Sequence, residues 1–248
     1  MTVLENSDGL EQALLNAKQY SRNKTLIVEE FIQRDHPHVI EAEIFSLNGE
    51  VISWGLMNSI RDCNTNPLLP AGYSYPLDLP EERISIVKKE VERLVKSMGT
   101  PSGAFNIEMI IDKSNNLYFL DAGPRNGGNM LPEFISMISN KDIVGATIRN
   151  AMGDTDGFDI ELDGRSGGNW GLVVLHAEKD GIFKGVRYST EAQRSIVRQN
   201  IQKQVGDPVK EFSTCNNLVG LSFLKFDSSN QMKDVMYNLS KSIQIELK

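Results

Sequence analysis

The feature that most constrains this chain is a pair of alternating runs, followed by a glycine-rich bend, within residues 105–132. Apolar and polar residues alternate over residues 105–112, and a second strand-like run covers residues 117–121. Turn-forming residues, KSNN at 113–116, separate the two runs. This pattern predicts a β-hairpin, because strand periodicity on both sides meets turn chemistry in the middle.

The position of the turn predicts which residues face each other. A turn centred between Ser114 and Asn115 places Glu108 opposite Asp121 and Asn106 opposite Gly123. The same register predicts three apolar pairs: Ile110 with Phe119, Met109 with Leu120, and Ile111 with Tyr118.

Opposed carboxylates have Cβ atoms about 5 Å apart and repel each other, so the pair Glu108 and Asp121 needs an explanation. A hard divalent cation is one, because Mg²⁺ takes carboxylate oxygens together with substrate phosphates. A shared proton is another, and Arg125 is a third. The alternative is a solvated surface hairpin whose acids repel weakly in water. The bend at residues 123–128, GPRNGG, favours a site, since backbone N–H groups and a guanidinium beside acids suit an anionic ligand clamped with a metal.

Composition excludes some classes of protein. The 248 residues are 40% hydrophobic and 24% charged, which is enough for one large domain or two small ones. A net charge of −7, without a long basic run, argues against nucleic-acid binding. Cys63 and Cys215 have neither metal-ligand spacing nor the pattern of a disulfide framework, which predicts a reducing, cytoplasmic setting. No apolar run reaches membrane-spanning length, so no membrane contact is expected.

Helices and strands are expected to alternate along the rest of the chain. Helical spacing predicts helices over residues 10–17, 81–98, 131–139, 142–152, 190–200 and 231–240. Strands are expected over residues 25–32, 39–45, 50–57, 170–176, 181–186, 218–226 and 242–247, the first of them buried. Residues 64–80 contain four prolines and are expected to form a loop over a site or at the edge of a lobe. The Gly- and Asp-rich residues 153–168 predict a boundary, which we place between regions 1–160 and 161–248.

The motifs now stand in a recognisable order: VEEFI at 28–32, two strands joined at Asn48-Gly49, IRDC at 60–63, a long helix, FNIEM and DAGPRNGG. This series resembles the ATP-grasp superfamily, which includes carbamoyl phosphate synthase large subunits, biotin carboxylase and amino acid ligases. The resemblance covers most of residues 1–160. It implies an α+β fold: the C-terminal lobe of an ATP-grasp enzyme, a largely antiparallel sheet with flanking helices, plus a small α+β C-terminal subdomain. Residues 1–30 would be a remnant of the first lobe, and 31–160 the lobe that holds metal and nucleotide.

The resemblance also implies roles for individual residues. Glu108 and Asp121 would hold Mg²⁺, with Mn²⁺ as the alternative ion, against the phosphates of ATP. Arg125 would stabilise charge on the transferred phosphoryl group or on an acyl phosphate. Arg61 is expected either near phosphates and substrate or in a surface ion pair. Glu29 or Glu30, with the backbone of Phe31 and Ile32, would contact adenine, although a plain strand end explains each of these two glutamates nearly as well. Glu41 or Glu43 would contact the ribose.

Two departures from the family pattern concern the metal. Gly123 stands where the family has an Asn that acts as a further ligand, and Asn106 or Asn126 are candidates to replace it. Asp121 stands where the family usually has Glu, which shortens the reach of the carboxylate by one methylene. The lysines and glycine-rich phosphate loop of the first lobe have no counterpart here. We therefore expect a fragment, or one half of a split enzyme, whose partner is the missing N-terminal part or a separate subunit.

The expected function is the C-terminal part of an ATP-dependent carboxylate–amine ligase. In such chemistry a carboxylate takes the γ-phosphoryl group and becomes an acyl phosphate, from which an amine displaces phosphate. The expected ligands are a nucleotide and small carboxylate and amine substrates. Three alternatives stay open: a carbamoyl phosphate synthase-like protein, a degenerate ATP-grasp lobe without catalysis, and a purely structural α+β domain.

Overall fold

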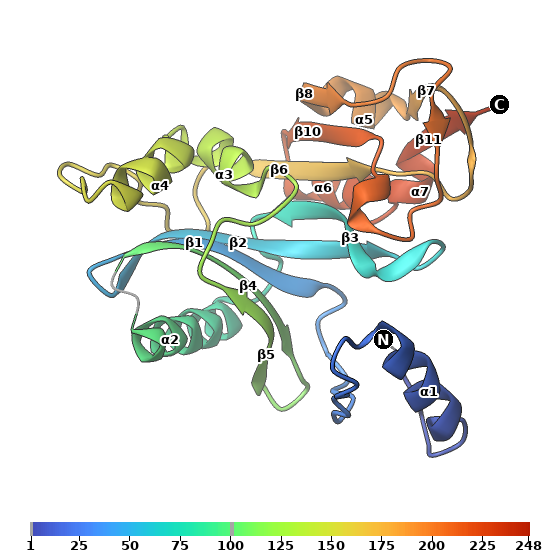
Figure 1. The fold of residues 1–248 in the computed structure, drawn as a ribbon. Helices are drawn as coiled ribbons and strands as arrows, with labels where there is room; N and C mark the ends of the chain where they lie inside the picture. Colours follow the sequence, from blue (N-terminus) through green and yellow to red (C-terminus); the bar gives the residue numbers. More distant parts are fainter. Residues whose placement is uncertain (1, 100–101) are drawn as a thin grey trace.

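The computed structural model describes residues 2–99 and 102–248. Within these residues, an antiparallel sheet of eight strands in the order β5-β4-β1-β2-β3-β6-β10-β8 forms the centre of the molecule (Figure 1). A second sheet of three strands, in the order β11-β7-β9, lies at the C-terminal end. The predicted α+β class with a largely antiparallel sheet is confirmed.

The elements are, in chain order, α1 (Leu10–Tyr20), β1 (Val39–Leu47), β2 (Glu50–Asp62), β3 (Asn66–Tyr75), α2 (Glu81–Met98), β4 (Gly103–Ile111), β5 (Leu117–Gly123), α3 (Leu131–Ser139), α4 (Ile143–Ala151), β6 (Asn169–Leu175), β7 (Gly181–Tyr188), α5 (Thr190–Ser195), β8 (Ile196–Ile201), β9 (Pro208–Val209), the 3₁₀ helix η1 (Cys215–Asn217), β10 (Gly220–Phe226), α6 (Ser229–Met236), α7 (Leu239–Ser242) and β11 (Ile243–Leu247).

Helix α2 covers one face of the main sheet and matches its predicted bounds (Figure 1). Pro80 precedes the helix, and Gly99 ends it in the left-handed conformation, with φ 69°. Its buried stripe packs against alternate residues of β1, β2 and β4. The stripe consists of Ile84, Val87, Val91 and Val95.

Helices α3 and α4 cover the opposite face (Figure 1). Phe45 of β1 and Phe134 of α3 belong to this second core, together with Tyr73 of β3. Because side chains alternate along a strand, Glu41 and Glu43 share the face of Phe45. The sheet is therefore buried on both faces along β1, and two acids lie inside the covered region.

A third core joins the C-terminal elements, packing β6 and β10 against α6 and the three-stranded sheet. The boundary at residue 160 stays a prediction. Strand β6 pairs with β3 and β10, so the C-terminal region contributes strands to the main sheet. Within residues 2–99 and 102–248, no helix combines the length and apolar character needed to cross a membrane.

Two sequence predictions in the N-terminal half are wrong. Residues 25–32 form no strand, and Ile27, Val28 and Phe31 are 82%, 72% and 66% exposed. The expected loop at 64–80 contains strand β3, which pairs with β2 and β6. Its Pro70 lies opposite Arg61, where the register of the two strands shifts. A proline is tolerated there because a bulge does not require every backbone N–H.

Two helices in the C-terminal half are shorter than predicted. The helix expected over 190–200 ends at Ser195, and the β-branched residues that follow begin β8. The helix expected over 231–240 is divided into α6 and α7, with Tyr237 and Asn238 between them.

Candidate functional site

The hairpin of β4 and β5 brings together the two acids expected to hold a metal. Glu108 pairs with Asp121 and Asn106 with Gly123, as predicted. Beyond Glu108 the register shifts by one residue, which leaves Leu120 as the extra residue of a β-bulge. The three predicted apolar pairs are therefore wrong: Met109 pairs with Phe119, Ile110 with Tyr118, and Ile111 with Leu117.

Strand β1 lies beside β4 and adds two more acids. Glu41 stands opposite Glu108, and Glu43 stands opposite Asn106. Both glutamate side chains are buried, each 2% exposed. We call Glu41, Glu43, Glu108 and Asp121 the carboxylate cluster. The resemblance implies a ribose contact for Glu41 or Glu43, and the structure places Glu41 beside the hairpin acid Glu108 and Glu43 beside Asn106.

Arg61, on β2, reaches the same cluster. Its Nη2 donates a hydrogen bond to Oε1 of Glu108 at 3.0 Å, and its side chain is only 7% exposed. The ion pair expected as one alternative for Arg61 is therefore present, but it is buried rather than on the surface. The other guanidinium nitrogen, Nη1, is buried without a hydrogen-bond partner in the described structure.

Asn106 links the carboxylates to the predicted catalytic arginine. Its amide donates to Oε1 of Glu41 at 2.5 Å and to Oε2 of Glu43 at 3.1 Å. Its carbonyl oxygen accepts a hydrogen bond from Nη1 of Arg125 at 3.1 Å. Asn106 is thus fully used in holding neighbouring groups in place. The other candidate ligand, Asn126, bonds instead to Thr147.

The glycine-rich bend closes over Glu43. The backbone N–H of Gly127 donates to both carboxylate oxygens of Glu43, at 3.0 and 2.9 Å. A Cβ at position 127 would lie 2.6 Å from Oε2 of Glu43 and 2.7 Å from Nδ2 of Asn106. Glycine is therefore required at this position, because only backbone without a side chain can approach the carboxylate so closely.

Burial makes the two inner glutamates difficult to ionise. It raises the pKa of Glu41 to about 8, and the charge of Glu108 adds to the effect. Burial likewise raises the pKa of Glu43 to about 7, although the hydrogen bond from the backbone N–H of Gly127 acts to lower this pKa. Oε2 of Glu41 is buried and has no hydrogen-bond partner among the described residues. A buried, unpartnered acceptor beside an unpartnered guanidinium donor fits a site for a cation together with an anion.

A metal at this site would need further ligands. Among the described residues, no group of three or more His, Cys, Asp or Glu is arranged to hold a metal ion by itself. Mg²⁺ commonly binds one or two carboxylates and completes its coordination with water and phosphate oxygens. The paired carboxylates of Glu108 and Asp121 fit that kind of ion.

The residues expected to contact adenine lie apart from this cluster. Glu29, Glu30 and Phe31 are exposed in the irregular segment, and Ile32 is half-buried there. In the part of the chain that the structure describes, no hydrogen bond or ion pair joins these four residues to the carboxylate cluster. A backbone hydrogen bond from Asp35 to Ile111, of 2.8 Å, ties the segment to β4. The adenine contacts stay a prediction.

Sequence analysis did not identify Asn129, and it placed Tyr73 only in a loop, residues 72–75, that either covers the substrate pocket or packs there. Asn129 donates to the hydroxyl oxygen of Tyr73 at 3.2 Å, and Tyr73 is buried on the cluster's side of the sheet. Burial, and then the charge of Glu41, raises the pKa of the Tyr73 hydroxyl. Tyr73 belongs to β3, which the prolines made resemble a loop. The signal that could have found it is the alternation of residues 71–75, AGYSY.

Neither a protein-family model nor a curated protein matches the sequence. Solved structures do match the fold. Phosphoribosylglycinamide synthetase from Anaerococcus prevotii matches with TM-score 0.71 and 23% identity, over 96% of this chain and 60% of that chain. L-amino acid ligase from Bacillus licheniformis matches with TM-score 0.78 and 18% identity, over 99% of this chain and 60% of that chain. The biotin carboxylase domain of 2-oxoglutarate carboxylase from Hydrogenobacter thermophilus matches with TM-score 0.71 and 20% identity, over 98% of this chain and 54% of that chain.

These likenesses show that the chain has the ATP-grasp fold, as the sequence resemblance predicts. The chain spans 54% to 60% of the length of the three chains it matches.

Proposed function

We propose that this chain is the metal- and nucleotide-binding part of an ATP-dependent carboxylate–amine ligase. One observation carries the proposal: a buried acceptor, Oε2 of Glu41, and a buried donor, Nη1 of Arg61, lack partners in the same cluster. Such groups are costly to bury unless a ligand satisfies them. Magnesium with a nucleotide phosphate would supply a cation and an anion at once. The likeness to a biotin carboxylase domain solved in complex with MgADP supports this ligand.

Glu108 and Asp121 would hold the Mg²⁺ ion, or Mn²⁺ in its place. The ion, when bound, would offset the negative charge of the ATP phosphates. Glu41 is the best candidate for a further ligand, because its free oxygen lies in the cluster. Asn106 and Asn126, the replacements considered for the ligand missing at Gly123, already bond to other groups.

Two arginines at the site, Arg125 and Arg61, would offset negative charge during the reaction. The substrate carboxylate would attack the γ-phosphoryl group of ATP, so that the bond to the β–γ bridging oxygen breaks, ADP leaves and an acyl phosphate forms. The amine would then attack the acyl carbon and lose a proton as phosphate leaves. Arg125, which Asn106 and the carbonyl of Asn126 orient, would offset charge that develops on the transferred group. Arg61 would present its free Nη1 to a phosphate oxygen.

The complete enzyme would need more residues than this chain provides. Because the chain spans 54% to 60% of the matched structures, we propose that a further segment or a separate subunit completes the nucleotide site. Glu29, Glu30, Phe31 and Ile32 would contact adenine there. The small-molecule carboxylate and amine substrates, and a cytoplasmic location, are part of the same proposal.

A specific observation favours a second candidate, a degenerate ATP-grasp lobe without catalysis. A Cβ at Gly123 would lie 3.2 Å from Nε of Arg125. An Asn at this position, as in the family, would therefore need Arg125 to shift slightly, because the arginine side chain lies where the Asn side chain would begin. Carbamoyl phosphate synthase-like chemistry stays the alternative within the catalytic class.

ADP release from Mg-ATP, measured with mixtures of carboxylates and amines, tests the proposal. The assay uses the full chain together with the segment or subunit that completes it. We expect E108Q and D121N each to lower ADP release roughly 100-fold or more, because each removes charge that stabilises the transition state. E82Q is the matched control, since Glu82 is an exposed acid on α2.

The outcomes separate the candidates. Unchanged ADP release in both E108Q and D121N would reject the metal role of these acids. A protein that binds Mg-ATP but releases no ADP with any mixture would favour the non-catalytic lobe.

A further inference from the structure

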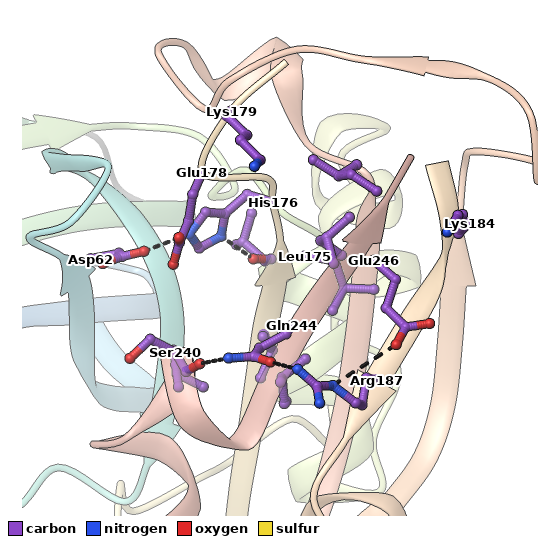
Figure 2. Close-up of a pocket in the computed structure, with 16 residues that line it drawn as sticks. Asp62, Leu175, His176, Glu178, Lys179, Lys184, Arg187, Ser240, Gln244 and Glu246 are labelled. Carbon is purple, nitrogen blue, oxygen red and sulfur yellow. Dashed lines mark hydrogen bonds and ion pairs between the residues drawn. The ribbon is translucent and has the colours of Figure 1, made fainter. Parts of the chain in front are cut away.

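A cavity of about 410 Å³ lies between the end of β6, helix α7 and the strands β7 and β11 (Figure 2). Its volume falls within the range of roughly 300–1,000 Å³ that is usual for small-molecule sites. No residue of the carboxylate cluster lines it. The cavity therefore belongs to a different part of the molecule and is not explained by the proposed ligase chemistry.

The floor of the cavity is aliphatic. Leu175 from β6 and Ile243 and Ile245 from β11 form part of its lining. Leu175 and Ile243 are 2% and 9% exposed, so this wall belongs to the packed core of the C-terminal region. A rigid apolar wall favours a ligand with an aliphatic body, because its burial removes apolar surface from water.

The rim carries charges of both signs, and some of them are already paired. Asp62 lies 3.0 Å from Nε2 of His176, and this hydrogen bond holds the pKa of the Asp62 carboxyl below its usual range. Glu246 faces Nε of Arg187 at 3.9 Å. These two acids therefore have partners within the protein, as the dashed lines in Figure 2 show.

Two lysines on the rim have no such partner. In the described part of the chain, no hydrogen bond or ion pair involves Lys179 or Lys184, and Glu178 is the one lining acid that is likewise unpaired. Lys179 comes from the loop after β6, on one side of the cavity, and Lys184 comes from β7, on the other (Figure 2). The three cations of the lining, Lys179, Lys184 and Arg187, equal its three acids in number. The feature that matters is therefore the placement of two unpaired cations on opposite sides of the aliphatic floor.

We infer that this cavity binds a small aliphatic dicarboxylate. One carboxylate would meet Lys179 and the other Lys184, while the hydrocarbon between them would lie on Leu175, Ile243 and Ile245. A monocarboxylate could satisfy only one end of the cavity, and a diamine would place like charges together at both ends. The ligand class follows from the placement of Lys179 and Lys184 on opposite sides of an aliphatic floor.

Titration of the full chain with adipate, followed by ¹H–¹⁵N NMR, tests this inference without ATP or any reaction. We expect saturable shifts that include the side-chain amide of Gln244 and the backbone amides near Lys179 and Lys184. Hexanoate should bind roughly tenfold more weakly, because it lacks one ion pair, and 1,6-diaminohexane should cause no saturable shift.

Variants locate the site. K179A and K184A should each weaken adipate binding roughly tenfold, to about the affinity of hexanoate. K89A is the matched control, since Lys89 is an exposed lysine on α2 outside the cavity. The NMR spectrum of each variant reports at the same time that it is folded. The inference would be overturned by absence of saturable adipate shifts, by wild-type adipate affinity in K179A and K184A, or by diamine binding as tight as adipate binding.

Discussion

Glu41 is the residue whose surroundings say most about the site. Its side chain is buried between Glu108 and Asn106, and one of its oxygens has no hydrogen-bond partner. Sequence reasoning identified Glu41 as a nucleotide contact but could not bring it to Glu108, because β1 and β4 are far apart in the sequence. Tyr73 was placed in a loop for a different reason, the prolines of β3. Partners that come from distant strands follow from sheet order, which local patterns do not encode.

Burial of Glu41 predicts how stability depends on pH in the presence of EDTA. The carboxyl has an ordinary pKa of 4.5 and a folded-state pKa of about 8. The folded protein therefore holds this proton more tightly than the unfolded chain does. The stabilising contribution is complete below pH 4.5 and is lost as pH rises toward 8.

We expect the free energy of unfolding to decrease with rising pH by less in E41Q than in the wild type. The difference should exceed about 1 kcal/mol, since one pKa unit corresponds to about 1.4 kcal/mol. Urea unfolding at several pH values across the window measures the free energy of unfolding. Glu82, exposed on α2, provides the control E82Q, which should keep the wild-type profile. An E41Q profile that declines as steeply as the wild type would contradict the assignment.

At the scale of elements, the hairpin shows why one prediction succeeded. The predicted turn was centred between Ser114 and Asn115, whereas Ile111 pairs with Leu117, which centres the real turn on Ser114. The bulge at Leu120 then restores the register, so Glu108 still meets Asp121. Two local departures compensate each other. A bulge of this kind has no reliable sequence signal, and pairs between the turn and the bulge could not be predicted.

Helix α2 was predictable because its signals agree at every level. A proline before it, a left-handed glycine after it and a regular apolar stripe all indicate the same bounds. Strand β3 was not predictable, because its prolines suggest a loop when the bulge beside Pro70 is unknown. The helix expected over 190–200 failed where β-branched residues paired with β10 instead.

The buried stripe of α2 gives a direct prediction of stability. I84A should lower the free energy of unfolding by roughly 2–5 kcal/mol, because Ile84 is 1% exposed and its truncation leaves a cavity against the sheet. I148A is the matched control, since Ile148 on α4 is 57% exposed, and it should change stability by about 0.5 kcal/mol or less. Denaturant unfolding measures both. Similar losses for the two variants would contradict the packing described here.

At the scale of the whole molecule, the N-terminal segment stands apart from the three cores. Helix α1 has no buried residue among those described, and it lies away from the sheet in Figure 1. Residues 25–34 have no regular structure. The strand predicted over 25–32 was wrong. A strand needs a neighbour to pair its backbone groups, and no strand of the two described sheets pairs with this segment. Sequence propensity alone does not reveal whether a neighbour is present.

Limited proteolysis tests whether the N-terminal segment is less stable than the three cores. Cleavage should occur first between residues 21 and 34, because this backbone is exposed and lacks the hydrogen bonds of a sheet. The fragment that begins near Asp35 should resist further cleavage, as its backbone is tied to Ile111 and the cores follow. Mass spectrometry of early time points identifies the sites. First cleavage within β1, β2 or β4 would contradict the description.

We propose that Glu108 and Asp121, with Glu41 and Arg61 beside them, hold a divalent cation together with a nucleotide. The direct test is Mn²⁺ titration of the full chain, together with the segment or subunit that completes it, in the presence of ATP, followed by electron paramagnetic resonance. The account predicts a protein-bound Mn²⁺ signal in wild type and E82Q that weakens about tenfold or more in E108Q and D121N. Equal Mn²⁺ affinity in all four proteins, or no protein-bound Mn²⁺ in any of them, would contradict it.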